Sequence, residues 1–370
     1  MNINIGYVVS DLYTHILSVS ILSLLENSGA DDEFNIFVLN SDVSEESKRK
    51  IEMLKEVKDF RIEYINMKNS EFEGIAEGIS VVSNYRIKMA SVLPKLDKIL
   101  FLDSDMIIMN SMVELYNTDL GENYFASVID PGADLQRQYT IEDDDKFPNP
   151  RFNTGLMLVN LKKWREDDIE RKIFDALRWY SKKYAYWPDQ NVMQMVCKDK
   201  ILTLNPSYNV SPILKQQNLY QVPGLWEQSS KDPKIIHICG MPKYWQKSRL
   251  LWEDIFWKYA KKTPYYEEFI SYLSDAKIED VNNSIKAIFI EIDMLKHRID
   301  DAEKRRKESI ILLDVYFHPF RFFLKKIKYR LMKHLTFGKR KRKYKNKYNL
   351  IQNRTESAAQ FIKEMKKGIQ

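Results

Sequence analysis

Two hydrophobic periodicities alternate along the chain up to about residue 240. Short runs rich in β-branched and aromatic residues are typical of strands, and segments with an apolar residue every three or four positions are typical of helices. Strands are predicted at residues 2–9, 34–40, 60–67, 98–102, 125–130, 155–161, 200–205 and 234–239, and the clearest helices at 13–27, 45–57, 83–94 and 169–184. This alternation predicts an α/β fold with a mixed, mainly parallel sheet flanked by helices.

The strand patterns stop at about residue 263. From Ile278 to Ala302 apolar residues are spaced alternately three and four apart, which is the a/d pattern of a coiled coil. That stripe needs a partner helix, either from this chain or from a second copy in a homo-oligomer. We predict an α/β domain over residues 1–262 and a helical, basic C-terminal add-on over residues 263–370.

Charge is distributed unevenly within the total of +6. Residues 316–348 hold 13 Lys and Arg and no Asp or Glu, whereas the chain up to residue 315 is net negative. Apolar residues in the basic segment recur at helical spacing, namely Phe320, Phe323, Ile327, Leu331 and Leu335. A basic amphipathic helix is typical of the surface of an anionic membrane. Packing of the stripe on the add-on, with solvated charges, is the plain alternative. Single-stranded nucleic acid is not the partner we expect, because no nucleic-acid-binding fold accompanies the segment.

The sequence has no sign of export or of a membrane span. No run reaches about 18 consecutive apolar residues, and the opening residues MNINIGYVVSDLY lack the basic and apolar regions of a signal peptide. Cys197 and Cys239 are too few for a disulfide framework. We therefore expect a cytoplasmic protein that is peripheral at the inner face of the cell membrane.

Two carboxylates interrupt the apolar segment 98–108, KILFLDSDMII. Asp103 and Asp105 directly follow a predicted strand, and ligands bind at the carboxyl ends of strands in sheets of this class. A buried carboxylate without a partner is costly, so a cation is expected beside the pair. Residues two apart in an extended segment point to one side, and such oxygen ligands suit Mg²⁺ or Mn²⁺. An exposed turn would explain Asp-x-Asp equally well if it stood alone.

A second candidate segment is KIIHICGMPKYW, at residues 234–245. His237 ends an apolar run and could complete a metal shell, although a structural histidine is the commoner reading of such a residue. Gly240 would let the backbone approach a ligand closely. Lys243 could neutralise a diphosphate as a point charge.

Four segments in order, NYRIKMASVLPKLDKILFLDSDMII, RFNTGLMLVNLKKWR, PDQNVMQMV and IIHICGMPKYW, together resemble glycosyltransferase family 8. The resemblance runs from about residue 3 to about residue 250. It implies a GT-A (Rossmann-like) fold and a divalent metal, usually Mn²⁺. It also implies a hexosyltransferase that moves galactose or glucose from a UDP-hexose with retention of anomeric configuration.

The resemblance also implies roles for individual residues. It assigns metal binding to Asp103, Asp105 and His237, donor binding to Asp11, Tyr13, Arg86, Ser104, Asn153, Gly240 and Lys243, and the catalytic set to Asp130, Asp189, Gln190 and Lys243. Lys243 would stabilise the leaving diphosphate, and Gln190 would lie on the face where a nucleophile is needed. Taken singly, Asp11 also fits a helix cap, Arg86 a surface ion pair and Asn153 a turn.

Two positions depart from the family pattern. Asn191 stands where the family often has Asp, which weakens any claim about a local acid–base partner. The segment 243–245 reads Lys-Tyr-Trp instead of Lys-Pro-Trp, which keeps the lysine and changes the turn. Because the amide of Gln190 is a poor nucleophile, we expect attack by the acceptor hydroxyl on the same face rather than double displacement.

The acceptor is predicted only as a class: a surface glycan, a glycolipid or a glycoprotein such as a serine-rich adhesin. The acidic residues 142–145 and the aromatic segment 208–226 are expected to line or cover its site, with a solvated loop as the alternative. The competing hypothesis is a catalytically silent scaffold or partner protein, held at the membrane by the basic tail. The intact Asp103, Asp105, His237 and Lys243 argue against it.

Overall fold

The computed structural model describes residues 1–72, 81–184, 188–246, 249–274, 319–335, 342–343, 345–353 and 356 of the 370-residue chain. The chain divides into two compact units, Met1–Ile278 and Glu279–Gln370. The coiled-coil pattern at residues 278–302 lies outside the described residues, so its pairing and the homo-oligomer remain predictions. The boundary between residues 262 and 263 likewise stays a prediction about domains.

The first unit alternates strands and helices along most of its length. Its strands are β1 (Asn2–Val8), β2 (Glu33–Asn40), β3 (Arg61–Asn66), β4 (Lys98–Leu102), β5 (Met106–Ile108), β6 (Phe125–Ile129), β7 (Phe152–Asn160), β8 (Ile201–Thr203) and β9 (Ile235–His237). Its α-helices are α1 (Thr14–Glu26), α2 (Glu45–Glu52), α3 (Met89–Val92), α4 (Val113–Tyr116), α5 (Ala133–Tyr139), α6 (Leu161–Glu166), α7 (Ile169–Lys183), α8 (Pro188–Val196), α9 (Pro212–Gln216), α10 (Leu225–Ser229) and α11 (Glu253–Ala260). Its 3-10 turns are η1 (Asp11–Tyr13), η2 (Met53–Glu56), η3 (Asn69–Phe72), η4 (Val81–Lys88), η5 (Ile141–Lys146) and η6 (Pro206–Tyr208).

The main sheet has seven strands in the order β3-β2-β1-β4-β7-β6-β8. Strand β7 is antiparallel to both of its neighbours, and the other pairs are parallel. The predicted mixed, mainly parallel sheet is therefore confirmed. The strand order reverses between β1 and β4, and in open α/β sheets ligands bind at such a switch point, beyond the carboxyl ends of the strands.

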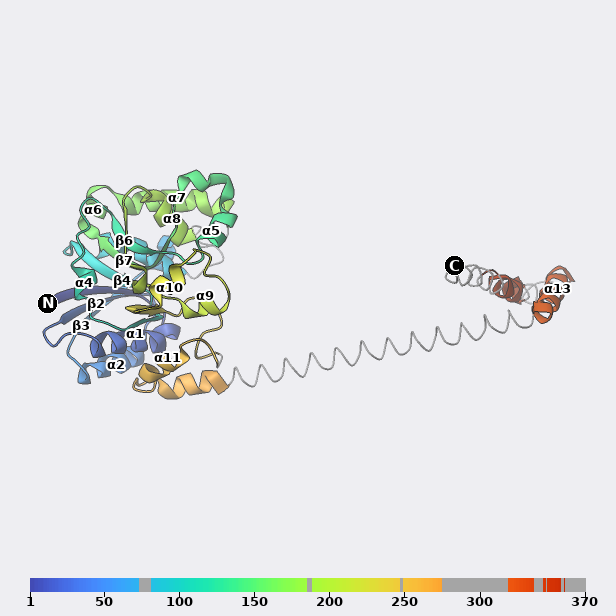
Figure 1. Ribbon diagram of the computed structural model, residues 1–370, viewed down its shortest axis with the longest axis horizontal. Helices are drawn as coiled ribbons and strands as arrows, with labels where there is room; N and C mark the ends of the chain where they lie inside the picture. The colour runs from blue at the N-terminus through green and yellow to red at the C-terminus, as the bar shows by residue number, and fades with distance from the viewer. Residues whose placement is uncertain are drawn as a thin grey trace. The chain divides into compact units, whose positions relative to one another are not determined.

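Helices cover both faces of this sheet (Figure 1): α6, α7 and α8 lie on one face, and α1, α2 and α11 lie on the other. Strand β4 shows why its sequence is apolar without interruption. Leu100 and Leu102 pack in one core, whereas Ile99 and Phe101 pack in the other. Each of these side chains is fully buried, which stabilises the fold by roughly 1.5–3 kcal/mol per residue.

The apolar residues after Asp105 do not continue β4. Strand β5 pairs with β9 in a separate two-stranded antiparallel sheet, in which Met106 lies opposite His237. The stretch that looks like one strand split by two carboxylates is therefore a turn between strands of two sheets. This pairing brings the end of β9 beside the Asp103–Asp105 turn.

The helix predicted at residues 83–94 is only partly correct. The segment forms the 3-10 turn η4 followed by the single-turn helix α3. Four consecutive residues of η4, Asn84 to Ile87, are buried. A regular amphipathic helix keeps one face in solvent. A segment with four consecutive buried residues has no such face, so the amphipathic-helix pattern does not apply to it.

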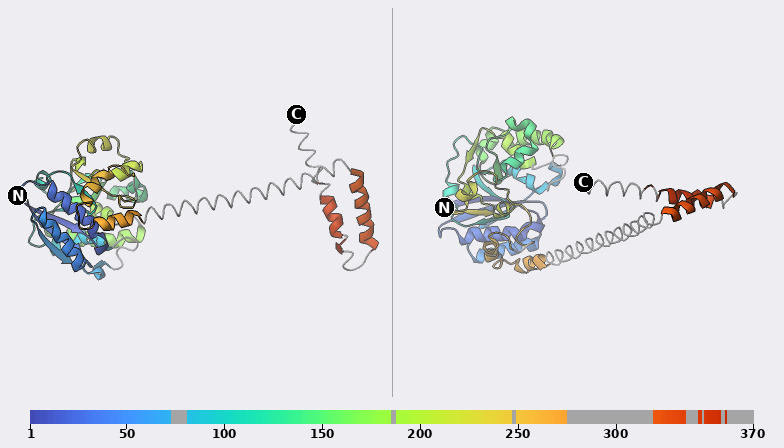
Figure 2. Two further views of the ribbon diagram at one scale, coloured as in Figure 1. Left: turned by 90° about the horizontal axis from the view of Figure 1, so that it is seen from below. Right: turned by 45° about the vertical axis from the view of Figure 1, so that its right-hand side comes forward.

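The first unit continues past the expected domain boundary as a packed structure. Residues 266–274 are helical, and the buried ring of Phe269 contacts Trp245 and Phe256. In the second unit, α13 (Pro319–Leu335) begins with a proline, a residue type that is favoured in the first turn of a helix. Figure 2 shows α13 beside a further helical segment, residues 345–353, and the two are linked by Lys333 over the ring of Tyr348.

Helix α13 presents an apolar stripe to solvent. Leu324, Ile327 and Leu331 are 50%, 40% and 56% exposed, beside the exposed cations Lys328 and Arg330. Within the described residues, no helix combines the length and the apolar character that crossing a membrane requires. The stripe is therefore a surface feature of an amphipathic helix.

Candidate active site

A pocket of about 390 Å³ lies at the carboxyl ends of the central strands. Its lining brings together residues from distant parts of the sequence, including η4, the β4–β5 turn, β7, α8 and the segment after β9. The residues predicted for the site that line it are Arg86, Asp103, Asp105, Asp130, Asn153, Asp189, Gln190, His237, Gly240 and Lys243. The fold thus collects most of the predicted constellation in one cleft.

Three side chains in this pocket form a candidate metal centre. One ligand atom each from Asp103, Asp105 and His237 can be chosen so that all lie within 4.8 Å of one another. The Nε2 atom of His237 lies 3.2 Å from Asp105 Oδ1 and 3.8 Å from Asp103 Oδ2. Two carboxylates and an imidazole fit a divalent cation such as Mn²⁺, for which oxygen and imidazole ligands are both suitable.

The backbone of Gly155 makes room for this convergence. The N–H of Asp103 donates to the carbonyl oxygen of Gly155 at 2.7 Å. A Cβ atom at position 155 would lie 2.6 Å from Asp103 Oδ2 and 2.7 Å from His237 Cε1. A side chain at position 155 would therefore force Asp103 or His237 to move. The sequence signals this only by one glycine inside an apolar strand.

Two cations balance the acidic groups. Lys243 Nζ donates to Asp105 Oδ2 at 2.6 Å. The guanidinium of Arg86 lies between Asp189, at 2.9 Å, and Asp103, at 3.4 Å. Arg86 is only 7% exposed, so it is not the surface ion-pair residue that its sequence context also allowed.

The shifted pKa values in this cluster reflect competition between burial and charge. Burial raises the pKa of Asp105, but Lys243 and His237 outweigh it and hold that pKa well below its usual range. Burial lowers the pKa of His237, but Cys239 and Asp105 raise it well above the ordinary value. Burial raises the pKa of Asp103 overall, with Arg86 and His237 opposing it. The site is preorganised to hold positive charge between the two carboxylates.

Hydrogen bonds connect the groups expected to face the donor sugar. Asn153 Nδ2 donates to Asp130 Oδ2 at 2.9 Å, and Gln190 Nε2 donates to the same oxygen at 3.3 Å. Gln190 Oε1 accepts from the backbone N–H of Thr154 at 3.0 Å. Burial raises the pKa of Asp130, and the bonds from Asn153 and Gly132 oppose this rise.

Gly240 and Lys243 occupy the segment that follows β9. Gly240 has a φ of +91°, a backbone conformation that side chains disfavour. A Cβ atom at this position would also lie 3.1 Å from a side-chain atom of Leu214 and 3.3 Å from one of Gln217. The predicted close approach of a ligand to Gly240 stays a prediction. Tyr244, which stands where the family pattern has proline, is buried in the core and is not among the described residues that line the pocket.

Asp11, Tyr13 and Ser104 do not appear among the described residues that line the pocket. Asp11 Oδ1 accepts from the backbone N–H and the hydroxyl of Ser44, at 3.0 and 3.1 Å. It thereby ties η1 to the N-terminus of α2, where the Ser44 side chain is the helix cap. Tyr13 is 47% exposed in the same loop, and Ser104 lies in the β4–β5 turn. Their nucleotide contacts remain predictions.

Asn191, which stands where the family often has Asp, points away from the cleft. It is fully buried, and its Nδ2 donates to the hydroxyl of Tyr180 on α7 at 2.9 Å. It is not among the described lining residues of the pocket. The missing carboxylate therefore leaves the pocket's own charges unchanged.

Sequence reasoning missed two buried amides of the site. Asn209 Nδ2 donates to Asn153 Oδ1, and Asn209 Oδ1 faces His237 Nδ1, both at 2.9 Å. Gln136 lines the pocket and is 3% exposed, with its Oε1 3.5 Å from Gln194 Nε2. A single polar residue in a loop or on a short helix carries no periodic signal that could have revealed either one.

The acidic residues 142–145, expected to line an acceptor site, make internal ion pairs. Asp143 contacts Lys183 and Asp144 contacts Arg151. From the aromatic segment 208–226, the lining includes Leu214, Gln217 and Leu219 instead of its aromatic rings. This side of the cleft therefore has an aliphatic and amide character in the described structure, and its role as an acceptor site stays a prediction.

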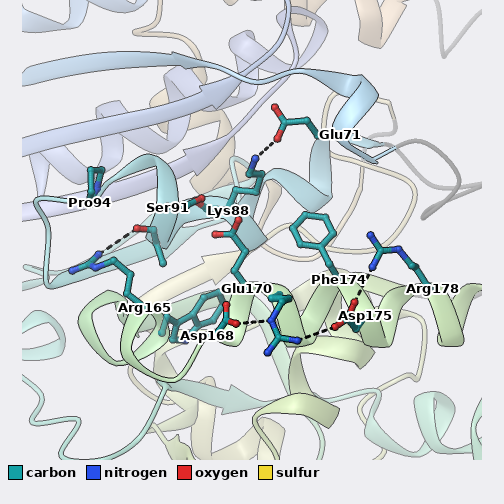
Figure 3. A pocket seen from close by; sticks show the side chains of 13 residues that line it. Glu71, Lys88, Ser91, Pro94, Arg165, Asp168, Glu170, Phe174, Asp175 and Arg178 are labelled. Atoms are coloured by element: carbon teal, nitrogen blue, oxygen red, sulfur yellow. Dashed lines mark hydrogen bonds and ion pairs between the residues drawn. The ribbon is translucent and has the colours of Figure 1, made fainter.

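A second hollow of about 610 Å³ lies between α3 and α7 (Figure 3). Lys88 pairs with Glu71, and Arg171 pairs with Asp168 and Asp175. These charged side chains pair with one another. Among the described residues, the hollow therefore has no cluster of acidic groups that converge on one point, as the first pocket has.

Comparisons with known proteins agree with this geometry. The model of the family Glycosyl transferase family 8 matches residues 4–249. General stress protein A of Bacillus subtilis is 22% identical over 283 residues, which are 74% of this chain and 93% of that protein. Lipopolysaccharide 1,2-glucosyltransferase of Escherichia coli K12 is 24% identical over 252 residues, 66% of this chain and 73% of that protein.

Solved structures show the same fold. The galactosyltransferase LgtC, in complex with donor and acceptor sugar analogs, has a TM-score of 0.62 at 24% identity, covering 71% of this chain and 96% of that one. The bifunctional glycosyltransferase WbbM has a TM-score of 0.61 at 21% identity, covering 73% of this chain and 51% of that one. The expected GT-A fold is confirmed.

Proposed function

The chain belongs to glycosyl transferase family 8 and is a hexosyltransferase, and we propose that it is a metal-dependent, retaining enzyme that uses UDP-galactose or UDP-glucose. One observation carries this proposal: Asp103, Asp105 and His237 converge beside Lys243 in the pocket. The acceptor that we propose is a surface glycan, a glycolipid or a glycoprotein such as a serine-rich adhesin.

The metal ligands would be Asp103, Asp105 and His237, whose spacing and the cradle at Gly155 fit a divalent cation. When bound, such an ion supplies electrostatic stabilisation to the oxygens of the diphosphate. Arg86 holds the carboxylates of Asp103 and Asp189 in place from the other side.

Lys243 is the second source of positive charge for the leaving group. Its Nζ atom bonds to Asp105 and to the carbonyl oxygen of Ile238. Burial lowers the pKa of Lys243, but the carboxylate of Asp105 raises that pKa by more than burial lowers it. The net shift is upward, so the amine stays protonated. A fixed ammonium beside the diphosphate stabilises the charge that develops as the bond to the sugar breaks.

The arrangement of Gln190 favours attack on the same face of the sugar. Its carbonyl oxygen accepts from the Thr154 N–H, and its amide donates to Asp130. An amide held at both ends is a poor nucleophile toward the anomeric carbon. The bond from the anomeric carbon to the diphosphate oxygen breaks while the acceptor hydroxyl oxygen bonds to that carbon. The hydroxyl proton passes to the departing phosphate.

Release of UDP from a panel of nucleotide sugars tests this function. Wild-type protein and Asp105→Asn would be assayed with Mn²⁺ and with EDTA, in the presence and absence of sugar acceptors. We expect turnover of a UDP-hexose that needs the metal and is lost in the variant, because one ligand becomes a neutral amide. Absence of Mn²⁺-dependent binding of any UDP-sugar would overturn the proposal and favour the silent scaffold.

We further propose a cytoplasmic enzyme whose basic tail attaches it to the inner face of the membrane. The exposed stripe of Leu324, Ile327 and Leu331 lies beside Lys328 and Arg330 on α13. Apolar residues can enter the interface while cations meet anionic headgroups. Such attachment would hold the pocket near acceptors that are assembled on a lipid.

A further inference from the structure

A continuous chain of side-chain hydrogen bonds joins the sugar side of the pocket to the metal side. Asp130 accepts from Asn153, Asn153 accepts from Asn209, and Asn209 faces His237. The middle residue, Asn209, follows η6 and is 4% exposed. It is not among the residues that line the pocket, so it acts through its two neighbours.

Backbone geometry fixes the direction of every bond in this chain. The N–H of Gly155 can only donate, and it lies 3.1 Å from Asn153 Oδ1. The Asn153 Oδ1 atom is therefore an acceptor, and the Asn209 atom 2.9 Å from it must be the donor Nδ2. The other end of the Asn209 amide is then the acceptor Oδ1, which lies 2.9 Å from His237 Nδ1.

An acceptor at this position determines the tautomer of the histidine. His237 Nδ1 must carry the proton that Asn209 Oδ1 accepts. In the neutral ring, Nε2 then keeps its lone pair, and this atom is the one that faces Asp105 and Asp103. Metal-binding histidines need such a partner on the second nitrogen to fix ring orientation and tautomer.

We propose that Asn209 is the positioning residue that couples the metal centre to the donor-sugar site. Its Oδ1 presents the Nε2 lone pair of His237 to the cation, and its Nδ2 holds Asn153 toward the sugar. This inference rests on the proposed metal-dependent function. One carboxamide thus performs two separable tasks, one through each of its atoms.

Two substitutions separate these tasks. Asn209→Ala removes both bonds, and we expect it to weaken Mn²⁺ binding by about 10- to 100-fold. Asn209→Asp keeps an acceptor for His237 but has no donor for Asn153. We expect near wild-type Mn²⁺ binding in that variant, with UDP-hexose binding weakened by about tenfold relative to UDP. Mn²⁺ affinity would be measured by electron paramagnetic resonance on the full chain without nucleotide, and nucleotide affinities by calorimetry.

Asn205→Ala is the matched control for the local backbone. The Asn205 side chain accepts from the Ser207 N–H and caps the turn η6 that leads to Asn209. Its loss costs about 1 kcal/mol of stability without touching His237 or Asn153. We expect this variant to bind Mn²⁺ and UDP-hexose as the wild type does.

A direct readout needs no variant. In Mg²⁺-loaded wild-type protein, ¹H–¹⁵N spectra of the imidazole rings should show His237 protonated at Nδ1 and not at Nε2. The inference is overturned if Nε2 carries the proton, if Asn209→Ala binds Mn²⁺ as the wild type does, or if Asn209→Asp loses Mn²⁺ as Asn209→Ala does. Should Asn209→Ala fail to fold, the spectra and Asn209→Asp decide. A wild-type protein that binds no Mn²⁺ even in the presence of UDP would overturn the proposed function itself, and this inference with it.

Discussion

Single residues decide whether the ligand-bearing segments can meet. Asp103 follows β4 and His237 ends β9, and both approach the bare Cα of Gly155 on β7. Asn209 then orients the imidazole from behind. These contacts join segments far apart in the sequence, and each depends on one small or neutral side chain.

Gly155→Ala should disable the metal centre. The new methyl group would lie 2.6 Å from Asp103 Oδ2 and 2.7 Å from His237 Cε1, so at least one ligand must move. A displacement of about 1 Å at a catalytic group costs roughly a hundredfold in rate. We expect Mn²⁺ binding and UDP-hexose turnover to fall together, measured by paramagnetic resonance and UDP release.

Gly121→Ala is a useful comparison for that variant. Gly121 has a φ of +50°, and a Cβ atom there would meet nothing within 4 Å, so alanine costs only backbone strain of about 1 kcal/mol. It should lower thermal stability without changing Mn²⁺ affinity. Equal Mn²⁺ affinity in Gly155→Ala and wild type would contradict the role of the cradle.

Gln190→Ala should slow the reaction because Gln190 positions the sugar, and not because Gln190 forms a covalent bond to it. The substitution removes the hydrogen bond from the Thr154 N–H and the hydrogen bond to Asp130. The sugar is then held less firmly, and we expect kcat to fall by about 10- to 100-fold. Mass spectrometry of wild-type protein quenched during turnover should find no sugar attached to Gln190. A trapped glycosyl adduct on this residue, absent from the variant, would refute same-face attack.

Elements of the first unit are tied together by an aromatic cluster around His15 on α1. The His15 ring lies 5.0 Å from that of Phe269, 5.2 Å from that of Tyr272 and 6.0 Å from that of Trp245. The residue is 6% exposed, and its Nε2 lacks a hydrogen-bond partner. This cluster packs α1 against residues 266–274, so the segment beyond α11 belongs to the core of the first unit.

Stability should depend on pH through His15. Burial lowers the pKa of His15 to about 4, against the opposing bond to the Leu12 carbonyl. The unfolded chain therefore binds this proton near pH 6.5, whereas the native protein binds it only near pH 4. The contribution of neutral His15 to the free energy of unfolding is therefore complete above pH 6.5. About 3 kcal/mol of this free energy is lost as the pH falls from 6.5 to 4.

Urea unfolding of wild type and His15→Phe between pH 4.5 and 7.5 measures this effect. The variant keeps a ring in the cluster but cannot titrate, so its stability should fall less steeply in that range. The difference between the two proteins isolates His15 from the carboxylates and from His237, whose pKa is shifted upward. Parallel loss of stability in both proteins would contradict the assignment.

At the scale of the whole molecule, an acidic catalytic unit is followed by a basic helical unit. The charged and apolar groups of α13 are exposed together, whereas the pocket lies in the first unit. Catalysis and surface attachment are therefore expected to be separable properties. Removing positive charge from the tail should release the protein from the membrane surface without changing the rate of the reaction.

Full-chain protein should float with anionic vesicles and not with neutral ones. Replacing Lys325, Lys328 and Arg330 by Gln should weaken binding by roughly 3 kcal/mol, about 1 kcal/mol for each cation near the surface. UDP release with a soluble acceptor should stay at the wild-type rate. Vesicle flotation and the UDP assay would be run on the same preparations.

The matched control removes the same charge from the first unit. Lys162, Arg171 and Arg178 have side chains that are 64%, 63% and 58% exposed, and their replacement by Gln should leave flotation unchanged. Binding that ignores lipid charge, or that falls equally in both triple variants, would remove the case for a membrane-attachment tail.

The sequence by itself determined the elements and the chemistry within each short segment. Alternating periodicities predicted most strands of the sheet and the helices α1, α2 and α7, because burial on one or two faces leaves a local pattern. The segment KILFLDSDMII predicted two carboxylates at the end of a strand, where the sheet places them.

Only the tertiary structure decided which of these segments share one cleft and which way their side chains point. The separate β5–β9 sheet brings His237 to Asp105, and Asn191 turns toward Tyr180 and away from the pocket. Arg86 is buried between two acids although its segment reads as an ordinary helix. Contacts between distant segments depend on strand order and packing, and a local pattern of polar and apolar residues records neither one.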